Sequence, residues 1–288
     1  MKLIPNRTAF SRYGEIITAS ILWGLAGILA KMINGMPAQS IIFYRVAFAS
    51  IIFFIALLIS GNLNIIKLGD KKAYLLLFAI LQAATMMTYF VSLLNASVSV
   101  AVLLLYTAPV YVTLFSPWLL KESSTKKGII ALVLSFAGIV LIVDPGKLEL
   151  SRYSIGILAG IASGITYAFQ IMTSKYLSLR YSGYSQAFWG FIIAMLILLP
   201  VGIAPMDVVF RNLNYLVLLA IFPTILAVSL YFNGLKKVRA QSASILGLIE
   251  PVSAVILAVL ILGEQISTLE IIGGVLILAG GALVTGEK

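Results

Sequence analysis

The residues of this sequence that could do chemistry are easiest to see in one apolar run, 243–265, which carries Glu250 and Pro251 side by side near its middle. About 20 apolar residues suffice to cross the hydrocarbon core of a membrane, so the run is long enough to span one. A carboxylate at the midplane costs roughly 2.5 to 3.5 kcal/mol, and proline removes a backbone hydrogen bond that lipid cannot replace. We therefore expect the side of this helix that carries Glu250 to face protein or a water-filled cavity.

Arg45 is a second charged residue inside an apolar segment, roughly 10 Å deep at 1.5 Å per residue. Charges in membranes are paired or functional by default. For Arg45 the alternatives are snorkelling or a structural pair, or a clamp for a carboxylate or phosphate, or an outer gate. Glu250 could cap the backbone groups freed by Pro251, or it could exchange protons or bind a coupling cation, because a buried carboxyl group favours its protonated form. A direct pair between Arg45 and Glu250 is a further option.

The sequence contains no cysteine and no histidine. Disulfides, thiol nucleophiles, histidine acid/base chemistry and the usual zinc ligand sets are therefore excluded. No nucleotide-binding loop of the GxxxxGK[ST] type is present, so any transport would be driven by a gradient. We predict no catalytic residue, no metal and no cofactor, and a protein that is not an enzyme. The alternative, an intramembrane enzyme acting on lipids, would need several converging acidic residues, whereas this chain offers Glu250.

The composition is that of an integral membrane protein. Hydrophobic residues make up 61% of the chain and charged residues 10%, and the mean hydropathy is +1.09, far outside the range of soluble domains. Polar breaks divide the chain into ten apolar segments, which we number spans 1 to 10: 13–33, 38–60, 73–94, 98–120, 128–143, 154–177, 185–203, 213–232, 241–262 and 268–285. The predicted fold class is an all-α integral membrane protein with ten transmembrane helices.

The basic residues predict the orientation of these spans. If the N-terminus is cytoplasmic, most Lys and Arg residues fall on the cytoplasmic side, and the other side has only Lys31, Lys147, Arg152 and Arg211. The positive-inside rule then places both termini in the cytoplasm. The rule also explains the formal charge of +10, so we expect no nucleic-acid partner. Lys31 and Lys175 lie near span ends, where we expect them to anchor the helices at the interface.

The chain also repeats itself. A shift of 142 positions brings like residues into register: Pro109 with Pro251, Glu122 with Glu264, Gly138 with Gly280, and Tyr89 with Tyr231. A shift of 144 aligns Lys31 with Lys175. We therefore predict two five-helix units, residues 1–145 and 146–288, and an odd number of spans inserts the second unit upside down. Inverted repeats that meet at the midplane with interrupted helices are typical of secondary transporters.

Two matching segments carry a family resemblance. YTAPVYVTLFSPWLLKESSTKKG, from Tyr106, and LIEPVSAVILAVLILGEQISTLEIIGG, from Leu248, resemble the two repeats of the EamA family in the drug/metabolite transporter superfamily. Each has a proline inside the helix, an apolar run that ends in glutamate, and a glycine-bearing last helix. The resemblance implies a ten-helix basket in which helices other than the fifth and tenth line a central cavity. It also implies alternating access that exports or imports amino acids and related metabolites, without indicating which substrate.

Several spans carry polar or aromatic side chains at spacings of three and four, which is the pattern of one helix face. Such residues can simply bond or pack against neighbouring helices, but their position around the expected cavity favours a lining. Related exporters of aromatic amino acids use aromatic residues on the third, fourth and sixth helices, and an aromatic lining would also suit an organic cation. The predicted substrate-binding residues are Trp23, Gln82, Tyr89, Tyr106, Tyr167, Gln170 and Tyr231. The predicted coupling or gating residues are Arg45, Pro109, Glu250 and Pro251.

From the sequence we expect a multi-pass transporter of the cell membrane that exports small amphipathic metabolites, above all aromatic or hydrophobic amino acids. The alternatives are proton-coupled efflux of organic cations, uptake of a metabolite, and the lipid-modifying enzyme. The expected partners are a small-molecule substrate and the lipid bilayer. Spans 5 and 10 lack polar stripes, so they could also form a homodimer contact.

Overall fold

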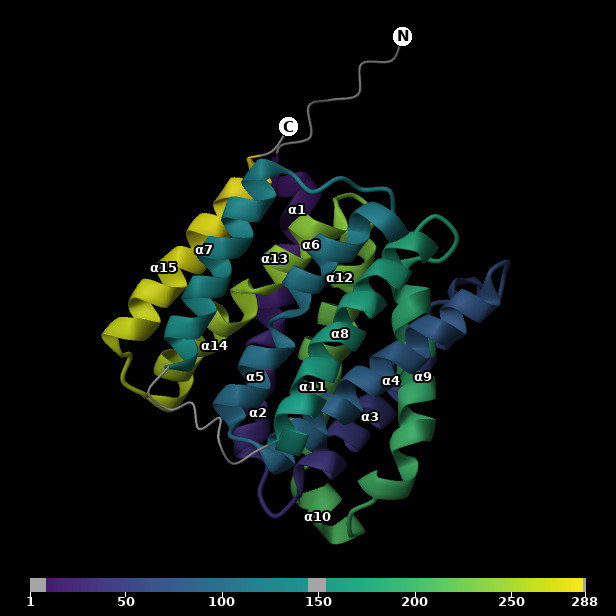
Figure 1. Ribbon diagram of the computed structural model, residues 1–288. Coiled ribbons are helices and arrows are strands. Elements are labelled where there is room, and N and C mark those ends of the chain that lie inside the picture. The colour runs from purple at the N-terminus through teal and green to yellow at the C-terminus, as the bar shows by residue number, and fades with distance from the viewer. Residues whose placement is uncertain (1–8, 145–153, 287–288) are drawn as a thin grey trace.

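The described residues of the chain fold into a basket of ten membrane-length helices. The structure, a computed structural model, describes residues 9–144 and 154–286, and among these it contains helices and no strand (Figure 1). Lys2, Arg7, Lys147, Arg152 and Lys288, which entered the orientation prediction, lie outside the described residues. The ten helices that are long and apolar enough to span a membrane are Tyr13–Met32, Ala38–Ile59, Lys72–Asn95, Val98–Leu119, Lys126–Val143, Ser154–Leu177, Gly183–Gly202, Leu213–Leu235, Ala240–Leu262 and Thr268–Thr285. The predicted all-α membrane fold with ten spans is thus confirmed.

Six spans are single helices: α3 (Ala38–Ile59), α4 (Lys72–Asn95), α7 (Lys126–Val143), α8 (Ser154–Leu177), α9 (Gly183–Gly202) and α15 (Thr268–Thr285). Short polar turns separate the spans, and side-chain caps fix several helix starts. The Thr125 hydroxyl accepts from the Gly128 N–H at the start of α7, and Ser267 forms a capping box with Glu270 at the start of α15. Such caps satisfy backbone N–H groups that a helix leaves unpaired.

The other four spans are interrupted. Span 1 consists of α1 (Ala9–Trp23) and α2 (Leu25–Met32), span 4 of α5 (Val98–Leu105) and α6 (Ala108–Leu119), span 8 of α11 (Leu213–Ala220), a π-helical turn (Ile221–Leu226) and α12 (Ala227–Leu235), and span 9 of α13 (Ala240–Gly247) and α14 (Ile249–Leu262). A short helix, α10 (Met206–Arg211), precedes span 8.

Prolines explain the breaks in spans 4 and 9. Each proline ring clashes with the carbonyl group four residues earlier, and the helices end at those residues, Leu105 for Pro109 and Gly247 for Pro251. Span 8 contains Pro223 inside its π-helical turn. Span 1 breaks at Gly24, where α14 approaches so closely that a Cβ would lie 2.8 Å from the Ala254 nitrogen.

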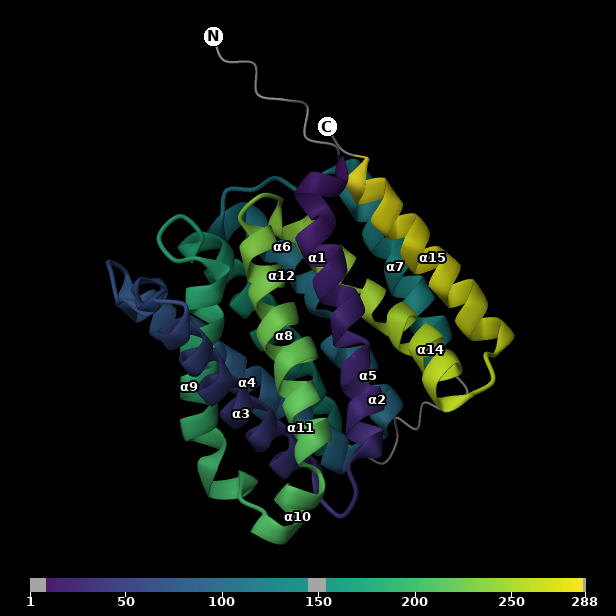
Figure 2. The same ribbon diagram turned by 180° about the vertical axis from the view of Figure 1, so that it is seen from behind.

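Helices α7 and α15 lie side by side at one edge of the basket, as both ribbon views show (Figures 1 and 2). A Cβ on Gly138 would lie 2.5 Å from the Gly273 carbonyl oxygen, and a Cβ on Gly280 would overlap the Ser135 hydroxyl. The glycines of these two helices therefore allow a close helix contact. The homodimer through the same helices stays a prediction, because their outward residues are apolar and exposed and suit lipid equally well.

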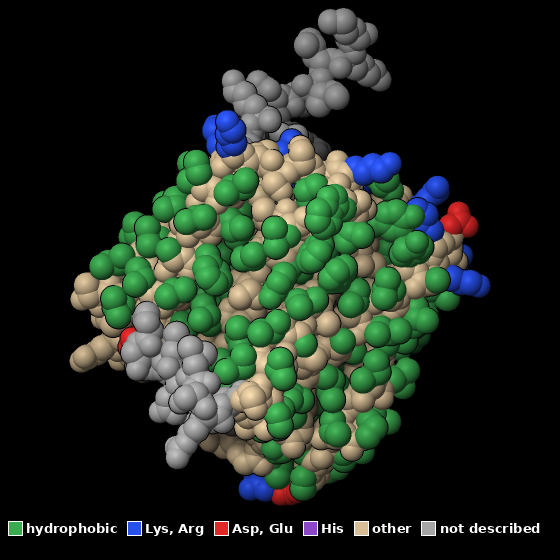
Figure 3. Space-filling view, viewed as in Figure 1, with side chains coloured by type: hydrophobic (Ala, Val, Ile, Leu, Met, Phe, Trp, Pro, Cys, Tyr) green, Lys and Arg blue, Asp and Glu red, His purple; other side chains and the backbone are tan. Residues whose placement is uncertain are grey.

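Charge divides the two ends of the basket. In the face seen in Figure 3, hydrophobic side chains cover the middle, and Lys and Arg side chains gather toward the end where α1 begins and α15 ends. We call that end the terminal end and the opposite one the far end. An apolar belt between two polar ends is the surface that a bilayer covers, so the chain is a multi-pass membrane protein.

Candidate functional site

A cavity of about 150 Å³ lies between the broken helices and their neighbours. Seven helices contribute to its wall, namely α1, α3, α4, α5, α8, α12 and α14, with Tyr106 from the break between α5 and α6. Its polar and aromatic lining residues are Trp23, Arg45, Gln82, Thr85, Tyr106, Tyr167, Gln170, Phe232 and Glu250. The lining therefore joins one acid, one base, two amides and several rings in a single small space.

The two proline breaks bring Tyr106 and Glu250 to this space. Tyr106 is the residue at which α5 ends, and Glu250 lies in the first turn of α14. Both also line a smaller cavity of about 10 Å³, next to Pro109, which is room for about one water molecule. Pro109 and Pro251 are buried, so they shape the cavity through the backbone rather than by offering a polar group.

The Glu250 carboxyl group faces the Tyr106 hydroxyl and the positive charge of Arg45. Within the described part of the chain Glu250 forms no salt bridge, so the direct pair between Arg45 and Glu250 is not formed. Its side chain accepts no hydrogen bond from a described backbone group either, and the Ser253 hydroxyl instead donates to the Glu250 carbonyl oxygen at 2.8 Å. The carboxyl group is thus turned toward the cavity and not toward the backbone freed by Pro251.

Arg45 donates hydrogen bonds from two of its nitrogen atoms to residues of span 8. Its Nε donates to the Thr224 hydroxyl at 2.5 Å and its Nη2 donates to the Pro223 carbonyl oxygen at 3.0 Å. The Thr224 hydroxyl in turn donates to the Leu219 carbonyl oxygen at 2.8 Å. The π-helical turn leaves backbone acceptors without their normal partners, and Arg45 supplies a donor there. Arg45 therefore ties α3 to the irregular turn while its guanidinium still lines the cavity.

Two amides meet on the opposite wall. The Gln170 Nε2 donates to the Gln82 Oε1 at 3.3 Å, which fixes the direction of the Gln82 amide. The Gln82 side chain is 4% exposed, and its Nε2 has no hydrogen-bond partner among the described residues. A Cβ on Gly190 of α9 would overlap the Gln82 Oε1, so this glycine makes room for the amide. An unpaired donor in a buried site costs about 1 to 3 kcal/mol unless an acceptor reaches it.

Two predicted site residues lie elsewhere. Tyr231 is fully buried and is not part of the cavity wall, because its ring packs on Trp23 at 4.9 Å and on Phe232 at 5.4 Å between ring centroids. Tyr89 is also outside the wall. The structure brings Trp23, Gln82, Tyr106, Tyr167 and Gln170 together in one cavity wall with Arg45 and Glu250. Their role in substrate binding stays a prediction.

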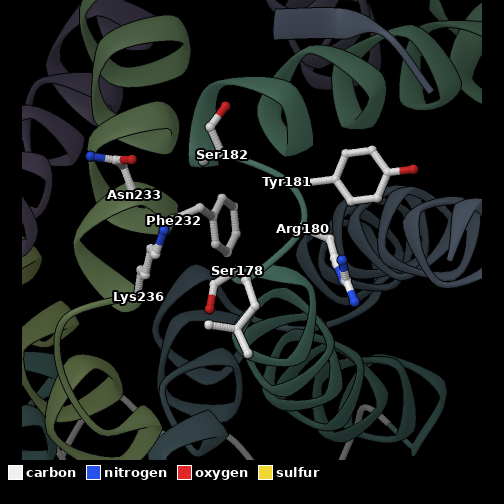
Figure 4. Close-up of a pocket in the computed structure, with 9 residues that line it drawn as sticks. Ser178, Arg180, Tyr181, Ser182, Phe232, Asn233 and Lys236 are labelled. Carbon is white, nitrogen blue, oxygen red and sulfur yellow. The ribbon is translucent and has the colours of Figure 1, made fainter. Parts of the chain in front are cut away.

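The sequence prediction omitted Thr85 and Phe232 from the site. Thr85 follows Gln82 by three residues on α4, and the helical period places it in the same polar stripe, although it was not among the predicted binding residues. Phe232 matches Phe90 at the shift of 142 positions, just as Tyr231 matches Tyr89, so the repeat does not tell which of the two adjacent aromatic residues lines the cavity. Phe232 lines the central cavity and also a second cavity of about 140 Å³ at the terminal end. In Figure 4 its ring lies at the centre of this second cavity, while Tyr181 points away from it. Phe232 thus separates the two spaces.

Comparisons with known proteins agree with this architecture. The family model described as "EamA-like transporter family" matches residues 14–144 and again residues 154–286. An "Uncharacterized transporter" of Archaeoglobus fulgidus is 30% identical over 274 residues, which cover 93% of this chain and 95% of the relative. The "Uncharacterized inner membrane transporter YicL" of Salmonella typhimurium is 29% identical and covers 94% of each chain.

A more distant relative carries a more specific name. The "Pseudopaline exporter CntI" of Pseudomonas aeruginosa is 24% identical over 186 residues, 64% of this chain and 63% of the relative. One solved protein structure matches with a TM-score of 0.83 at 20% identity, covering 95% of this chain and 96% of that one. At that identity the likeness shows a shared fold and nothing about the substrate.

Proposed function

We propose that this chain, which belongs to the EamA-like transporter family, is a secondary transporter that exports small amphipathic metabolites, above all aromatic or hydrophobic amino acids, across the cell membrane. Both termini would lie in the cytoplasm, as the distribution of basic residues suggests. The two five-helix units would be inverted relative to each other and would rock around the central cavity. The gradient that drives export would be one of ions or of the substrate itself.

The main support for this proposal is that the cavity holds a carboxyl group without a salt bridge and an amide donor without a hydrogen-bond partner among the described residues. The Glu250 carboxyl group lines it without a salt bridge to any described residue, and the Gln82 Nε2 is a buried donor without a partner. A substrate with an ammonium group and an acceptor oxygen would satisfy both. The rings of Trp23, Tyr106 and Tyr167 would hold its apolar part.

A second function is supported by the same carboxyl group. Glu250 lies among aromatic rings, which attract organic cations by cation–π interaction, so proton-coupled efflux of organic amines would use the same wall. The distant similarity to a pseudopaline exporter supports export as the direction for either substrate class. The two functions differ in whether the substrate also needs an acceptor oxygen for Gln82.

Vesicles reconstituted with the purified protein and loaded with labelled phenylalanine test the proposal. We expect wild-type vesicles to lose label faster than empty ones, and Glu250→Gln to lower the rate 10- to 100-fold, because a hydrogen bond to a charged group contributes about 1.5 to 3 kcal/mol. Asp207→Asn is the matched control, since Asp207 is an exposed acid paired with Arg211 outside the cavity.

Tetraphenylphosphonium, which has no acceptor oxygen and no proton to donate, separates the second function. If folded protein moves the phosphonium ion but not phenylalanine, efflux of organic cations replaces amino-acid export. If it moves neither, nor any amine from a metabolite mixture, the transport proposal fails.

A further inference from the structure

A buried ion pair at the terminal end connects different parts of the chain. Lys175 Nζ lies 3.5 Å from Glu122 Oε1, and the two side chains are only 16% and 22% exposed. Both also bind the turn 235–240 between α12 and α13. Lys175 donates to the Leu235 carbonyl oxygen at 2.9 Å, and Glu122 accepts from the Ala240 N–H at 2.8 Å. The pair therefore fastens the ends of α6 and α8 to the turn that joins spans 8 and 9.

A second ion pair lies at the far end, where it is exposed. Lys31 Nζ lies 2.7 Å from Glu264 Oε1, and the side chains are 62% and 48% exposed. They line a hollow of about 240 Å³ together with small residues of α2 and α14 such as Gly27 and Ala258. None of the described hydrogen bonds joins this pair to the turn 93–98 between α4 and α5. The far end thus has the same Lys–Glu pair as the terminal end, but there the pair is not bonded to a turn between two helices.

The sequence repeat relates the two ends group by group. The shifts of 142 and 144 positions pair each member of the fastened cluster with one at the far end: Glu122 with Glu264, Lys175 with Lys31, Leu235 with Leu93, Val238 with Ala96, and Ala240 with Val98. In both cases the lysine comes from one predicted unit and the glutamate from the other. The acceptors and the donor of the turn are backbone groups, so the change of side chain from Val238 to Ala96 does not remove them.

We propose that the two ion pairs are latches that close the two ends of the cavity in turn. In the present conformation Glu122 and Lys175 hold the turn 235–240 and close the terminal end. In the opposite conformation they release it, and Glu264 and Lys31 bind the Val98 N–H and the carbonyl oxygens of the turn 93–98. This inference rests on the proposed transport function, and it replaces the expectation that Lys31 and Lys175 only anchor the helices at the interface.

The chemistry of the fastened latch explains why it holds. The Glu122 carboxylate receives the first N–H of α13, where the helix dipole favours a negative charge, and the Lys175 ammonium lies on carbonyl groups at the end of α12. Gln241 adds two contacts of 3.3 Å, as acceptor for the Thr125 N–H and as donor to the Thr113 hydroxyl. Its counterpart at the far end is the shorter Ser99. We therefore expect the conformation closed at the terminal end to predominate at rest.

Paired cysteines can report which end is closed, because the chain has no native cysteine. The pair S123C/R239C reports the terminal end, since Arg239 Nη1 donates to the Ser123 carbonyl oxygen at 3.4 Å. Its counterpart at a shift of 142 is Q265C/S97C, which reports the far end. Each pair is treated in native membranes with a short bifunctional thiol reagent, and the crosslinked fraction is measured. Glu122→Gln or Glu264→Gln is then added to each pair.

Glu122→Gln is expected to lower the S123C/R239C crosslinking yield severalfold and to raise that of Q265C/S97C. Glu264→Gln, at an exposed site that tolerates the change, is expected to do the reverse. Asp207→Asn serves as the control and should change neither yield. If either glutamine variant leaves both yields unchanged, or changes them in the same direction, the latches are static anchors and the proposal is wrong. The readout needs no substrate, so a protein that moves no phenylalanine could still show the exchange, and a working transporter could still lack it.

Discussion

Arg45 and Glu250 share a cavity without sharing a salt bridge, and this separates their roles. Two donors of Arg45 are committed to Thr224 and Pro223, whereas the Glu250 carboxyl group has Tyr106 beside it and no salt bridge within the described residues. A guanidinium group that already bonds to the backbone and a hydroxyl stabilises the fold, whereas a carboxyl group without a salt bridge is free to bind a ligand. The two charges inside the spans should therefore differ in what their loss does.

Arg45→Lys should lower stability, because an ammonium group cannot reproduce the fork that reaches the Thr224 hydroxyl and the Pro223 carbonyl oxygen together. Loss of one charged hydrogen bond predicts about 1.5 to 3 kcal/mol. Thermal unfolding in detergent measures the change, and Lys72→Met is the control, since Lys72 is exposed and forms no salt bridge among the described residues. An unchanged midpoint together with a large loss of phenylalanine binding would instead make Arg45 a ligand clamp.

Gly190→Ala should weaken substrate binding without unfolding the protein. The new Cβ would overlap the Gln82 Oε1 and turn the amide whose Nε2 is the unpaired donor of the cavity. We expect the KM for phenylalanine to rise severalfold, in line with one hydrogen bond of about 1 kcal/mol. Gly27→Ala is the matched control, because nothing lies within 4 Å of a Cβ there. Equal KM values for the two variants would remove Gln82 from the binding site.

At the scale of the elements, the ten spans and two of their four breaks could be predicted from the sequence. Span length and polar breaks are local signals, and Pro109 and Pro251 force their interruptions through their own rings. The break at Gly24 depends on the close approach of Ala254, far away in sequence, so no local pattern indicates it. The π-helical turn contains Pro223, and it also accepts a hydrogen bond from Arg45 of another span, a contact that no local pattern indicates.

The same distinction explains the site. Helical spacing pointed to Gln82 and Gln170, and the family resemblance favoured Tyr106 and Tyr167. The structure puts these four residues and Trp23 on the cavity wall. Tyr231 is, like Tyr106 and Tyr167, a tyrosine well inside its span, but it packs against Trp23 and is fully buried outside the wall. Tyr231 and Phe232 are adjacent, and only Phe232 lines the central cavity. Packing against neighbouring helices decides this, and the helical repeat of the sequence does not predict it.

Gly138→Ala should destabilise the contact between α7 and α15. A Cβ there would lie 2.5 Å from the Gly273 carbonyl oxygen, which is backbone and cannot turn away, so the helices must separate. Overpacking of this kind costs typically 1 to 3 kcal/mol, measured as a lower midpoint of thermal unfolding. Gly274→Ala, one residue beyond Gly273 and in ordinary contact at 3.6 Å, should be neutral or slightly stabilising. If both variants behaved alike, the two helices would not be held at this distance in the membrane.

At the scale of the whole molecule, the proposed inversion of the two units predicts on which side of the membrane each turn lies. Asn95 lies in the turn between spans 3 and 4, and Lys237 occupies the equivalent turn between spans 8 and 9, 142 positions later. If the units are inverted, these equivalent turns lie on opposite sides of the bilayer. The basic turn around Lys237 should then be cytoplasmic and the uncharged turn at Asn95 external.

Single cysteines test this directly in a chain that has none. N95C should react with a membrane-impermeant thiol reagent in intact cells, and K237C should react only after the cells are opened. The Asn95 side chain donates to the Val91 carbonyl oxygen one turn earlier, and Lys237 forms an ion pair with Glu15 at 2.8 Å. N95C therefore removes one local hydrogen bond and K237C one partly exposed ion pair, and neither loss should unfold the protein. Labelling of both positions from the same side would mean that the units are parallel, because no conformational change moves a turn across the hydrocarbon core. The latches at the two ends would then lose their symmetry, and the cavity would need another account of how it opens.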